Sequence, residues 1–101
     1  MFSSLYTAII NIERFFGNNA FKRYDNGKFK SRISPILFEA LVTTELLYPD
    51  KKFTDKSSMI ENYKSIFNEN DEYEKYFTQA TGSVKNIKNR VATMKRVLFN
   101  D

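Results

Sequence analysis

The sequence predicts an all-α fold, a compact bundle of about five helices with one basic loop that contains at most a short hairpin. Two observations support this fold class. Apolar residues recur at steps of three and four over most of the chain, the spacing that gathers them on one side of a helix. Cap and turn residues interrupt this periodicity at short intervals. A length of 101 residues corresponds to one domain, so we expect residues 1–101 to form a single helical domain.

The first helix is expected from about Ser3 or Ser4, as its N-cap, to Phe16, because its apolar residues follow the helical spacing. Gly17 comes directly after the last periodic residue, where glycine accepts the left-handed conformation of a helix C-cap. Phe21 lies shortly after this glycine. We expect it to fold back onto the apolar face of the first helix.

A basic segment, KRYDNGKFKSR at residues 22–32, separates the first two expected helices. Its centre, Asp25-Asn26-Gly27, is a turn sequence, so the flanking residues form at most two short strands. The second helix is expected over about Pro35–Leu47, with Ser34 as its N-cap and proline in its first turn. Apolar residues cover most of its circumference, which indicates a central, buried helix.

Three further helices complete the expected fold. We place the third from residue 55 or 57 to Phe67, the fourth over residues 70–80 and the fifth after its cap, Ser83. The fifth helix carries cations on most of its faces and a single apolar seam. The seam consists of Val84, Ile87, Val91, Met94 and Leu98.

Histidine and cysteine are both absent from the chain. Disulfides, thiolate nucleophiles, imidazole bases, Ser-His-Asp triads and nearly every zinc site are therefore excluded. A magnesium site made of carboxylates alone remains chemically possible. Glu39 is the most interesting carboxylate because it is set in an apolar helix, but a buried Glu satisfied by Arg or Tyr is commoner than a general base. We expect no cofactor and no enzymatic activity.

Charge is segregated along the sequence. Residues 1–32 hold six basic and two acidic groups, residues 33–80 hold five and nine, and residues 81–101 hold five and one. One interpretation is an anionic partner that contacts both basic ends. We favour the other, in which the ends pack near the acidic middle, because a net charge of +4 is mild for a nucleic-acid binder.

The basic segment combines cations, which neutralise phosphates, with Tyr24 and Phe29, whose faces could stack on bases. Its candidate nucleic-acid contacts are Lys22, Arg23, Lys28, Lys30 and Arg32. The alternative, which we favour, is a solvated loop in which Phe29 fills the core.

The fifth helix provides a second cationic surface with Lys85, Lys88 and Arg90 as candidate nucleic-acid contacts. Arg90 lies beside the apolar seam, so we expect it to be partly buried. An ion pair with a carboxylate of the acidic middle is then more probable for Arg90 than a phosphate contact.

No apolar run approaches the ~18 residues of a transmembrane helix. The N-terminus also lacks the features of a secretory signal. We therefore expect a cytoplasmic protein with no membrane partner and no small-molecule substrate. The absence of cysteine fits a reducing compartment.

Several short motifs, taken in order, resemble one family. They are Phe16-Gly17, Ala20-Phe21, the basic variable loop, Ile33-Ser34-Pro35, Leu37-Phe38-Glu39-Ala40, and later Phe77, Thr81-Gly82 and Arg90. Between about Tyr6 and Val97 the chain resembles the C-terminal helical portion of the ParB/sulfiredoxin-like DGQQR family, found in GmrSD-type restriction systems. The resemblance implies a bacterial protein that acts in defence against phage or foreign DNA.

Complete proteins of that family have a nucleotide-hydrolysing and DNA-processing N-terminal domain, sometimes beside a histidine-metal nuclease. This chain has one glutamine, Gln79, and no histidine, so it lacks both the DGQQR motif and the nuclease centre. No catalytic residue of the family carries over. The resemblance extends only to structural positions, which are Phe21, Leu37, Phe38, Phe77 and Gly82.

Two functional hypotheses follow from the sequence. The first is a non-catalytic helical domain that contacts DNA, or the acidic surface of a catalytic nuclease or nucleotide-hydrolysing partner, through its basic segments. The second is a stand-alone protein-interaction module or regulator, such as one from a phage or mobile element, that binds a defence enzyme through exposed aromatic residues and does not bind nucleic acid.

Overall fold

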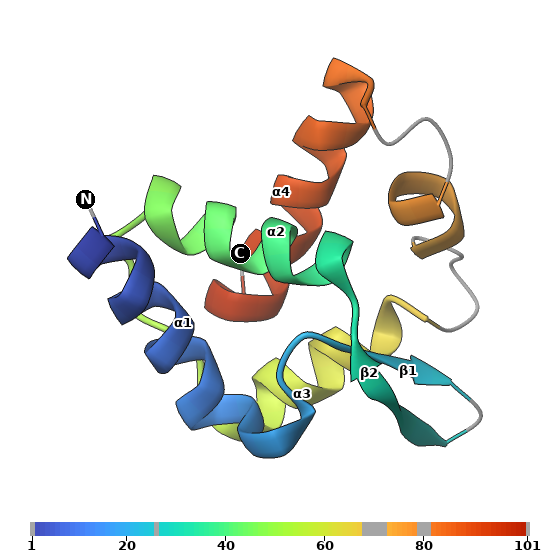
Figure 1. Cartoon of the computed structure of the whole chain (residues 1–101), viewed down its shortest axis with the longest axis horizontal. Coiled ribbons are helices and arrows are strands. Elements are labelled where there is room, and N and C mark those ends of the chain that lie inside the picture. The colour runs from blue at the N-terminus through green and yellow to red at the C-terminus, as the bar shows by residue number, and fades with distance from the viewer. Residues whose placement is uncertain (1, 26, 68–72, 79–81, 101) are drawn as a thin grey trace. The chain divides into compact units, whose positions relative to one another are not determined.

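The computed structural model describes residues 2–25, 27–67, 73–78 and 82–100 (Figure 1). These residues are mostly helical, but they also form a two-stranded antiparallel hairpin. The short hairpin that the sequence allowed in the basic segment is present, with an irregularity between Lys22 and Tyr24, so the fold is mostly helical and the all-α class is corrected in this respect. The chain divides into two compact units, Met1–Lys51 and Lys52–Asp101. The single domain over residues 1–101 stays a prediction.

The first unit contains two α-helices and, between them in the chain, a short helical turn and the hairpin. Its elements are α1 (Phe2–Phe16), the 3-10 helix η1 (Gly17–Asn19), β1 (Lys22–Asp25), β2 (Lys28–Ile33) and α2 (Pro35–Leu47). α1 packs against α2, and Ala8, Ile12 and Phe16 of α1 are buried. Both helices lie within two residues of the ranges expected from the sequence.

Local sequence signals set the helix ends in the first unit. Gly17 follows α1 with a φ of 60°, a conformation that glycine adopts without steric cost. The Ser34 side chain accepts a hydrogen bond from the Leu37 N–H at 3.5 Å and so caps α2. Pro35 occupies the first turn, where no N–H donor is needed. These predictions are confirmed.

The middle of α2 is buried, as expected for a helix with apolar residues around most of its circumference. Its buried residues are Leu37, Ala40, Leu41, Val42 and Thr44. The Thr44 hydroxyl donates a hydrogen bond to the Ala40 carbonyl at 2.8 Å, which satisfies this buried polar group. Leu46 and Leu47 are exposed, so burial does not extend to the last turn.

Phe21, directly before the hairpin, packs against Phe38 of α2. Only 2% of the residue is exposed, and its ring meets the Phe38 ring edge-on at a centroid distance of 4.8 Å. The Phe21 carbonyl accepts a hydrogen bond from the Ser34 N–H at 2.8 Å. Its φ of 65° lies in the left-handed region, which costs a residue with a side chain about 1–2 kcal/mol. These contacts hold Phe21 in its strained conformation.

The second unit consists of two packed α-helices and a short π-helix: α3 (Lys56–Ser65), η2 (Glu74–Thr78) and α4 (Val84–Phe99). The expected third helix is confirmed, but it ends at Ser65 rather than Phe67 because the chain turns there. The expected fourth helix, residues 70–80, is described only over residues 73–78, where π-helical geometry replaces the α-helix. Its remaining residues lie outside the described part of the chain.

Side-chain caps begin both α-helices of the second unit. The Asp55 carboxylate accepts a hydrogen bond from the Ser58 N–H at 2.9 Å, and the Ser83 hydroxyl accepts one from the Asn86 N–H at 3.1 Å. These bonds satisfy amide groups that have no partner within the helix. α4 ends at Asn100, which adopts a φ of 60°.

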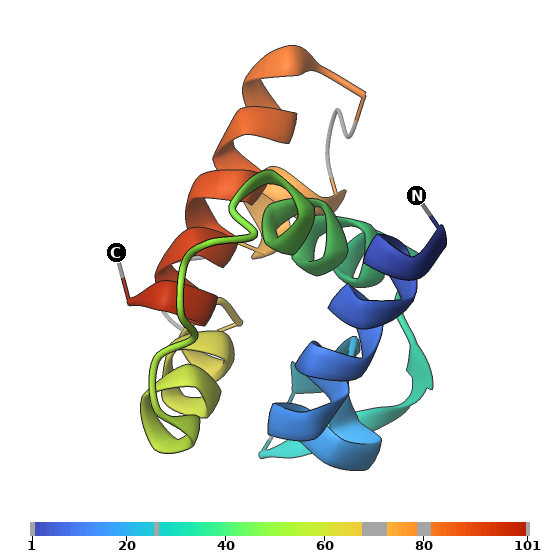
Figure 2. The same cartoon turned by 90° about the vertical axis from the view of Figure 1, so that its left-hand side faces the viewer.

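Polar contacts connect α4 to its neighbours at both of its ends. Asn62 of α3 donates a hydrogen bond to the Arg96 carbonyl at 3.1 Å, and α3 lies beside the C-terminal end of α4 in Figure 2. Asn86, in the first turn of α4, donates to the Lys75 carbonyl of η2 at 3.5 Å. Thus α3 contacts the last turns of α4, whereas η2 contacts its first half.

The apolar seam expected along α4 is only partly buried. Met94 and Leu98 are fully buried and Val91 is half-buried, whereas Val84 and Ile87 are 68% and 42% exposed. A helix buries only the turns that lie against a neighbour, so periodicity alone overestimated the buried length. The continuous seam is therefore corrected for the first turns of α4.

Aromatic residues connect α3 to η2 through a series of ring contacts. Tyr63 meets Phe67 at a centroid distance of 5.4 Å, and Phe67 meets Tyr73 at 4.9 Å. Tyr73 then stacks on Phe77 at 5.6 Å. Tyr63 is fully buried, and burial raises the pKa of its phenol well above the usual range. These rings form part of the core of the second unit.

Candidate functional site

The two faces of the hairpin differ in chemistry. Tyr24 pairs with Phe29 and Asp25 pairs with Lys28 across the antiparallel strands. Directly opposed residues share a face, and successive residues along a strand alternate between faces. The two aromatic residues therefore lie on one face, and Asp25, Lys28 and Lys30 lie on the other.

The cationic face of the hairpin is accessible to a partner. The Lys30 ammonium lies 3.5 Å from a carboxylate oxygen of Asp25, but their side chains are 53% and 38% exposed, so water screens this ion pair. A phosphate can therefore compete for Lys30 at little cost. Of the five expected cations, Lys22 is half-buried, whereas Arg23, Lys28, Lys30 and Arg32 are exposed.

Tyr24 and Phe29 contact each other rather than presenting two open rings. Their ring centroids are 5.1 Å apart in an edge-to-face arrangement, and both residues are half-buried. Tyr24 and Phe29 lie on the face of the hairpin opposite to Lys28 and Lys30, so the aromatic surface is separate from those cations. The expectation that Phe29 fills the core is wrong, because Phe21 is the buried aromatic residue of this region.

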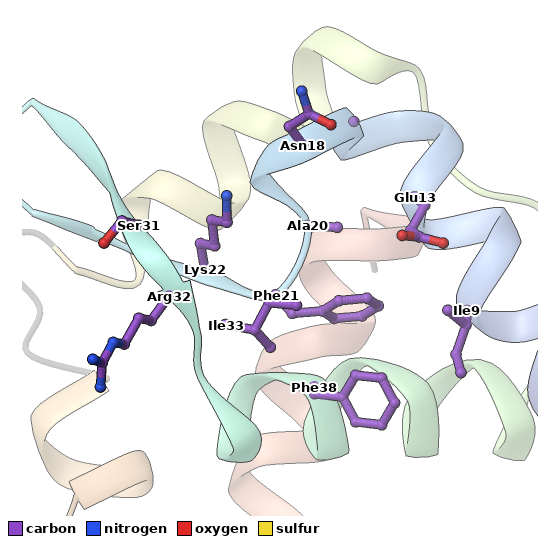
Figure 3. A pocket seen from close by; sticks show the side chains of 11 residues that line it. Ile9, Glu13, Asn18, Ala20, Phe21, Lys22, Ser31, Arg32, Ile33 and Phe38 are labelled. Atoms are coloured by element: carbon purple, nitrogen blue, oxygen red, sulfur yellow. The ribbon is translucent and has the colours of Figure 1, made fainter.

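A pocket of about 700 Å³ opens beside the hairpin in the first unit (Figure 3). Its apolar walls come from Ile9 of α1, Phe21, Ile33 of β2 and Phe38 of α2. Its volume lies within the range of roughly 300–1,000 Å³ typical of small-molecule pockets. Phe21 is held at this wall by its ring contact with Phe38 and by the hydrogen bond that its carbonyl accepts from the Ser34 N–H.

Charged side chains of both signs line this pocket. Glu13, near the end of α1, directs its carboxylate toward the pocket in Figure 3. Lys22 of β1 and Arg32 of β2 line the side formed by the hairpin, and the Arg32 guanidinium points away from the aromatic rings. Sequence analysis identified the two cations but not Glu13, because nothing in the local pattern indicates that α1 and the hairpin share a pocket.

Arg90 does not belong to an accessible cationic surface. The residue is 5% exposed, and its guanidinium donates a hydrogen bond to the Tyr76 carbonyl at 2.8 Å. Its expected burial is confirmed, whereas a direct phosphate contact is corrected because that contact needs an accessible guanidinium. Its expected ion pair stays a prediction. Lys85 and Lys88 of the same helix are exposed.

The carboxylates of α2 differ from the expectation. Glu39 is exposed, so it is not the buried acid suggested by its apolar sequence context. Glu45 is half-buried, and one of its carboxylate oxygens is buried without a hydrogen-bond partner within the described residues. Burial raises the pKa of Glu45, and a hydrogen bond with the Asn11 side chain opposes this shift.

Residues 2–25, 27–67, 73–78 and 82–100 contain no group of three or more acidic, histidine or cysteine side chains placed to hold a metal ion. In the same ranges, no helix has both the length and the apolar character needed to cross a membrane. The exposed cations of the hairpin and the pocket lined by charged and apolar residues are therefore the candidate functional features of the described residues.

Comparisons with protein-family models, curated proteins and solved structures found no match to this chain. The resemblance to the DGQQR family consequently rests on the sequence motifs alone.

Proposed function

We propose that this chain is a non-catalytic binding module whose hairpin contacts the phosphate backbone of DNA. The exposure of Arg23, Lys28, Lys30 and Arg32 on one small hairpin is the observation that carries the proposal. Cations gathered on one element attract phosphates and displace their condensed counterions. Such contacts require no catalytic group.

Phosphates, rather than stacked bases, meet the cationic face of the hairpin in this proposal. Lys28 and Lys30 share that face, and the screened pair between Lys30 and Asp25 is weak enough to exchange for a phosphate contact. Tyr24 and Phe29 support the hairpin from the opposite face. Binding by this face alone is independent of DNA sequence.

The proposal extends to the family that the sequence motifs resemble. The chain then corresponds to the C-terminal helical bundle of a GmrSD-type restriction protein, which acts in the bacterial cytoplasm against phage DNA. A catalytic nuclease or nucleotide-hydrolysing partner supplies the chemistry in that arrangement. The mostly helical fold supports this extension, and the hairpin occupies the position of the basic variable loop.

Fluorescence anisotropy with labelled single- and double-stranded DNA over a salt series tests the proposal. Affinity should fall as salt rises, with a logarithmic slope of about −0.9 for each phosphate contact on duplex DNA. The triple variant Lys28→Glu, Lys30→Glu, Arg32→Glu should lose the salt-sensitive binding. Circular dichroism should show that its helical content is retained, because all three side chains are exposed.

A matched control separates the hairpin from net charge. Lys51, Lys52 and Lys56 are also exposed but lie outside the hairpin, and replacing all three with Glu changes the net charge by the same amount. This control should retain most of the binding, since it keeps the hairpin contacts. Equal losses in the two triple variants would show that overall charge, not the hairpin, governs binding.

The first turns of α4 support a second candidate function, a protein-interaction module. Val84 and Ile87 are exposed beside the exposed Lys85 and Lys88. An apolar patch with cations around it is suited to an acidic protein surface. Retention of a partner after nuclease treatment, together with its loss from Ile87→Glu, would favour this module over DNA binding.

A further inference from the structure

We propose that the pocket of the first unit receives one unstacked nucleobase of a bound single-stranded DNA, and that Glu13 accepts a hydrogen bond from the exocyclic amino group of that base. This inference rests on the proposed function and deepens it. The hairpin holds the backbone, and the pocket adds a preference among bases. No contact of the cationic face alone would supply such a preference.

The pocket walls have the chemistry that a planar base requires. Phe21 and Phe38 point toward one another across the wall, with centroids 4.8 Å apart, and Ile9 faces them from α1 (Figure 3). Phe21 is 2% exposed and supports Phe38 from behind, so the half-buried Phe38 ring is the aromatic surface on which a base can stack. Contact with an aromatic ring replaces part of the stacking that a base loses on leaving the strand. The volume of about 700 Å³ leaves room for the attached sugar.

Opposite charges lie on different sides of these walls. Lys22 and Arg32 belong to the hairpin, and the Arg32 guanidinium points away from the rings, so it can contact the backbone of a strand outside the pocket. Glu13 belongs to α1 and directs its carboxylate toward the pocket. A nucleotide matches this arrangement because it carries an anion at one end, a ring in the middle and amino donors at the far edge.

The Glu13 carboxylate accounts for the choice of base. Glu13 is exposed, so its carboxylate oxygens are free of burial and accessible to a hydrogen-bond donor of the ligand. Glutamate accepts readily from the amino group of cytosine, and adenine also carries an exocyclic amino group, whereas thymine has none. The pocket should therefore prefer cytosine or adenine to thymine.

Phe21 provides a structural reason to regard the pocket as built. A phenylalanine with a φ of 65° is unusual, and here it positions an aromatic ring at the pocket wall. Strained residues persist where surrounding contacts determine them, and they cluster at ligand sites. The hydrogen bond from Ser34 to the Phe21 carbonyl ties this strain to the start of α2.

A free aromatic amino acid, or the end of a peptide, also combines a ring with two opposite charges. Continuity with the hairpin favours the nucleotide, because Lys22 and Arg32 of the pocket lie on the same strands as the exposed Arg23, Lys28 and Lys30. A bound strand can thus extend from the pocket along the hairpin. Binding of a free aromatic amino acid in place of the nucleotide would overturn the inference.

Anisotropy with labelled oligo(dC), oligo(dA) and oligo(dT) of equal length tests the base preference at one low salt concentration. The native chain should bind oligo(dC) or oligo(dA) about tenfold more tightly than oligo(dT), the effect of one hydrogen bond to a charged group. Glu13→Met should bring the ratio of the affinity for oligo(dC) or oligo(dA) to that for oligo(dT) close to one. Glu13→Gln retains a carbonyl acceptor and should restore part of the preference.

Glu39→Met is the matched control, because Glu39 is also exposed in the first unit but does not line the pocket. Its change of charge equals that of Glu13→Met, so it should leave the ratio unaltered. Loss of the ratio in both variants would attribute the effect to charge and overturn the inference. A readout based on the ratio also corrects for any general gain in affinity when a carboxylate is removed.

The remaining outcomes separate this inference from the proposed function. Binding that depends on the hairpin but is equal for all oligonucleotides would keep the proposed function and overturn the pocket inference. No binding to any oligonucleotide would overturn both. NMR titrations with deoxycytidine monophosphate and with phenylalanine complete the test: shifts at Ile9 and Phe38 with the nucleotide are expected, and shifts with phenylalanine alone would overturn the inference.

Discussion

At most positions a glycine variant is less stable than the alanine variant. At position 21 we expect the opposite order, with Phe21→Gly more stable than Phe21→Ala. Phe21 is buried, so either change removes an aromatic side chain from the core of the first unit. Such a truncation costs about 3–5 kcal/mol. The difference between the two variants, however, depends on the backbone of residue 21 and not on the lost ring.

The magnitude of that difference follows from the φ of 65° at Phe21. Glycine is usually less stable than alanine by roughly 0.5–1 kcal/mol, because it loses more backbone entropy on folding. In the left-handed region alanine pays about 1–2 kcal/mol that glycine avoids. Phe21→Gly should therefore be more stable than Phe21→Ala by roughly 0.5–1 kcal/mol.

Urea denaturation followed by circular dichroism measures the free energies of unfolding of both variants. Ala40→Gly is the control, since Ala40 lies within α2 and glycine there should cost about 1 kcal/mol. The midpoint temperature of thermal unfolding should fall by roughly 12–24 °C if Phe21→Ala loses about 3 kcal/mol of unfolding free energy. A more stable Phe21→Ala than Phe21→Gly would refute the left-handed backbone and the argument for the pocket wall.

Two further predictions concern buried polar groups. Glu45→Gln should raise stability at neutral pH. Burial raises the pKa of Glu45 above its usual 4.5. The native chain is therefore most stable, relative to Glu45→Gln, below pH 4.5, where Glu45 is protonated. This relative stability is lost as the pH rises through the folded-state pKa. Urea denaturation of both chains over a pH series checks this, and parallel pH profiles would contradict it. Arg90→Leu should cost about 1–3 kcal/mol because the Tyr76 carbonyl loses its donor, whereas Lys88→Leu at an exposed site should change stability by less than ~0.5 kcal/mol. Similar losses in these two variants would contradict a structural role for Arg90.

Helix ends were predictable because their signals are local. Gly17, Ser34 and Ser83 each act on backbone groups within three residues, and each does what its residue type predicts. The turn sequence after Asp25 likewise predicted where the hairpin reverses, although not how regular its strands are. These features need no knowledge of which segments meet in space.

The candidate site was predictable only in part. The sequence identified Lys22 and Arg32 as cations of a basic segment, but not that they share a pocket with Glu13. It also assigned core burial to Phe29, whereas Phe21 is the buried residue. The sequence did predict that Phe21 packs on apolar residues, but the spacing within the basic segment could not show that Phe29 stays half-buried beside Tyr24.

The sequence by itself determined a mostly helical chain, the starts of the capped helices α2, α3 and α4, and the basic segment, because these follow from the spacing and caps of neighbouring residues. The tertiary structure decided the Tyr76 partner of Arg90, the partial burial of Glu45, the exposure of Val84 and the position of Glu13 at the pocket. Periodicity specifies which residues share a side of a helix, but burial depends on the neighbour that lies against each turn. That neighbour comes from elsewhere in the chain, beyond the reach of local patterns.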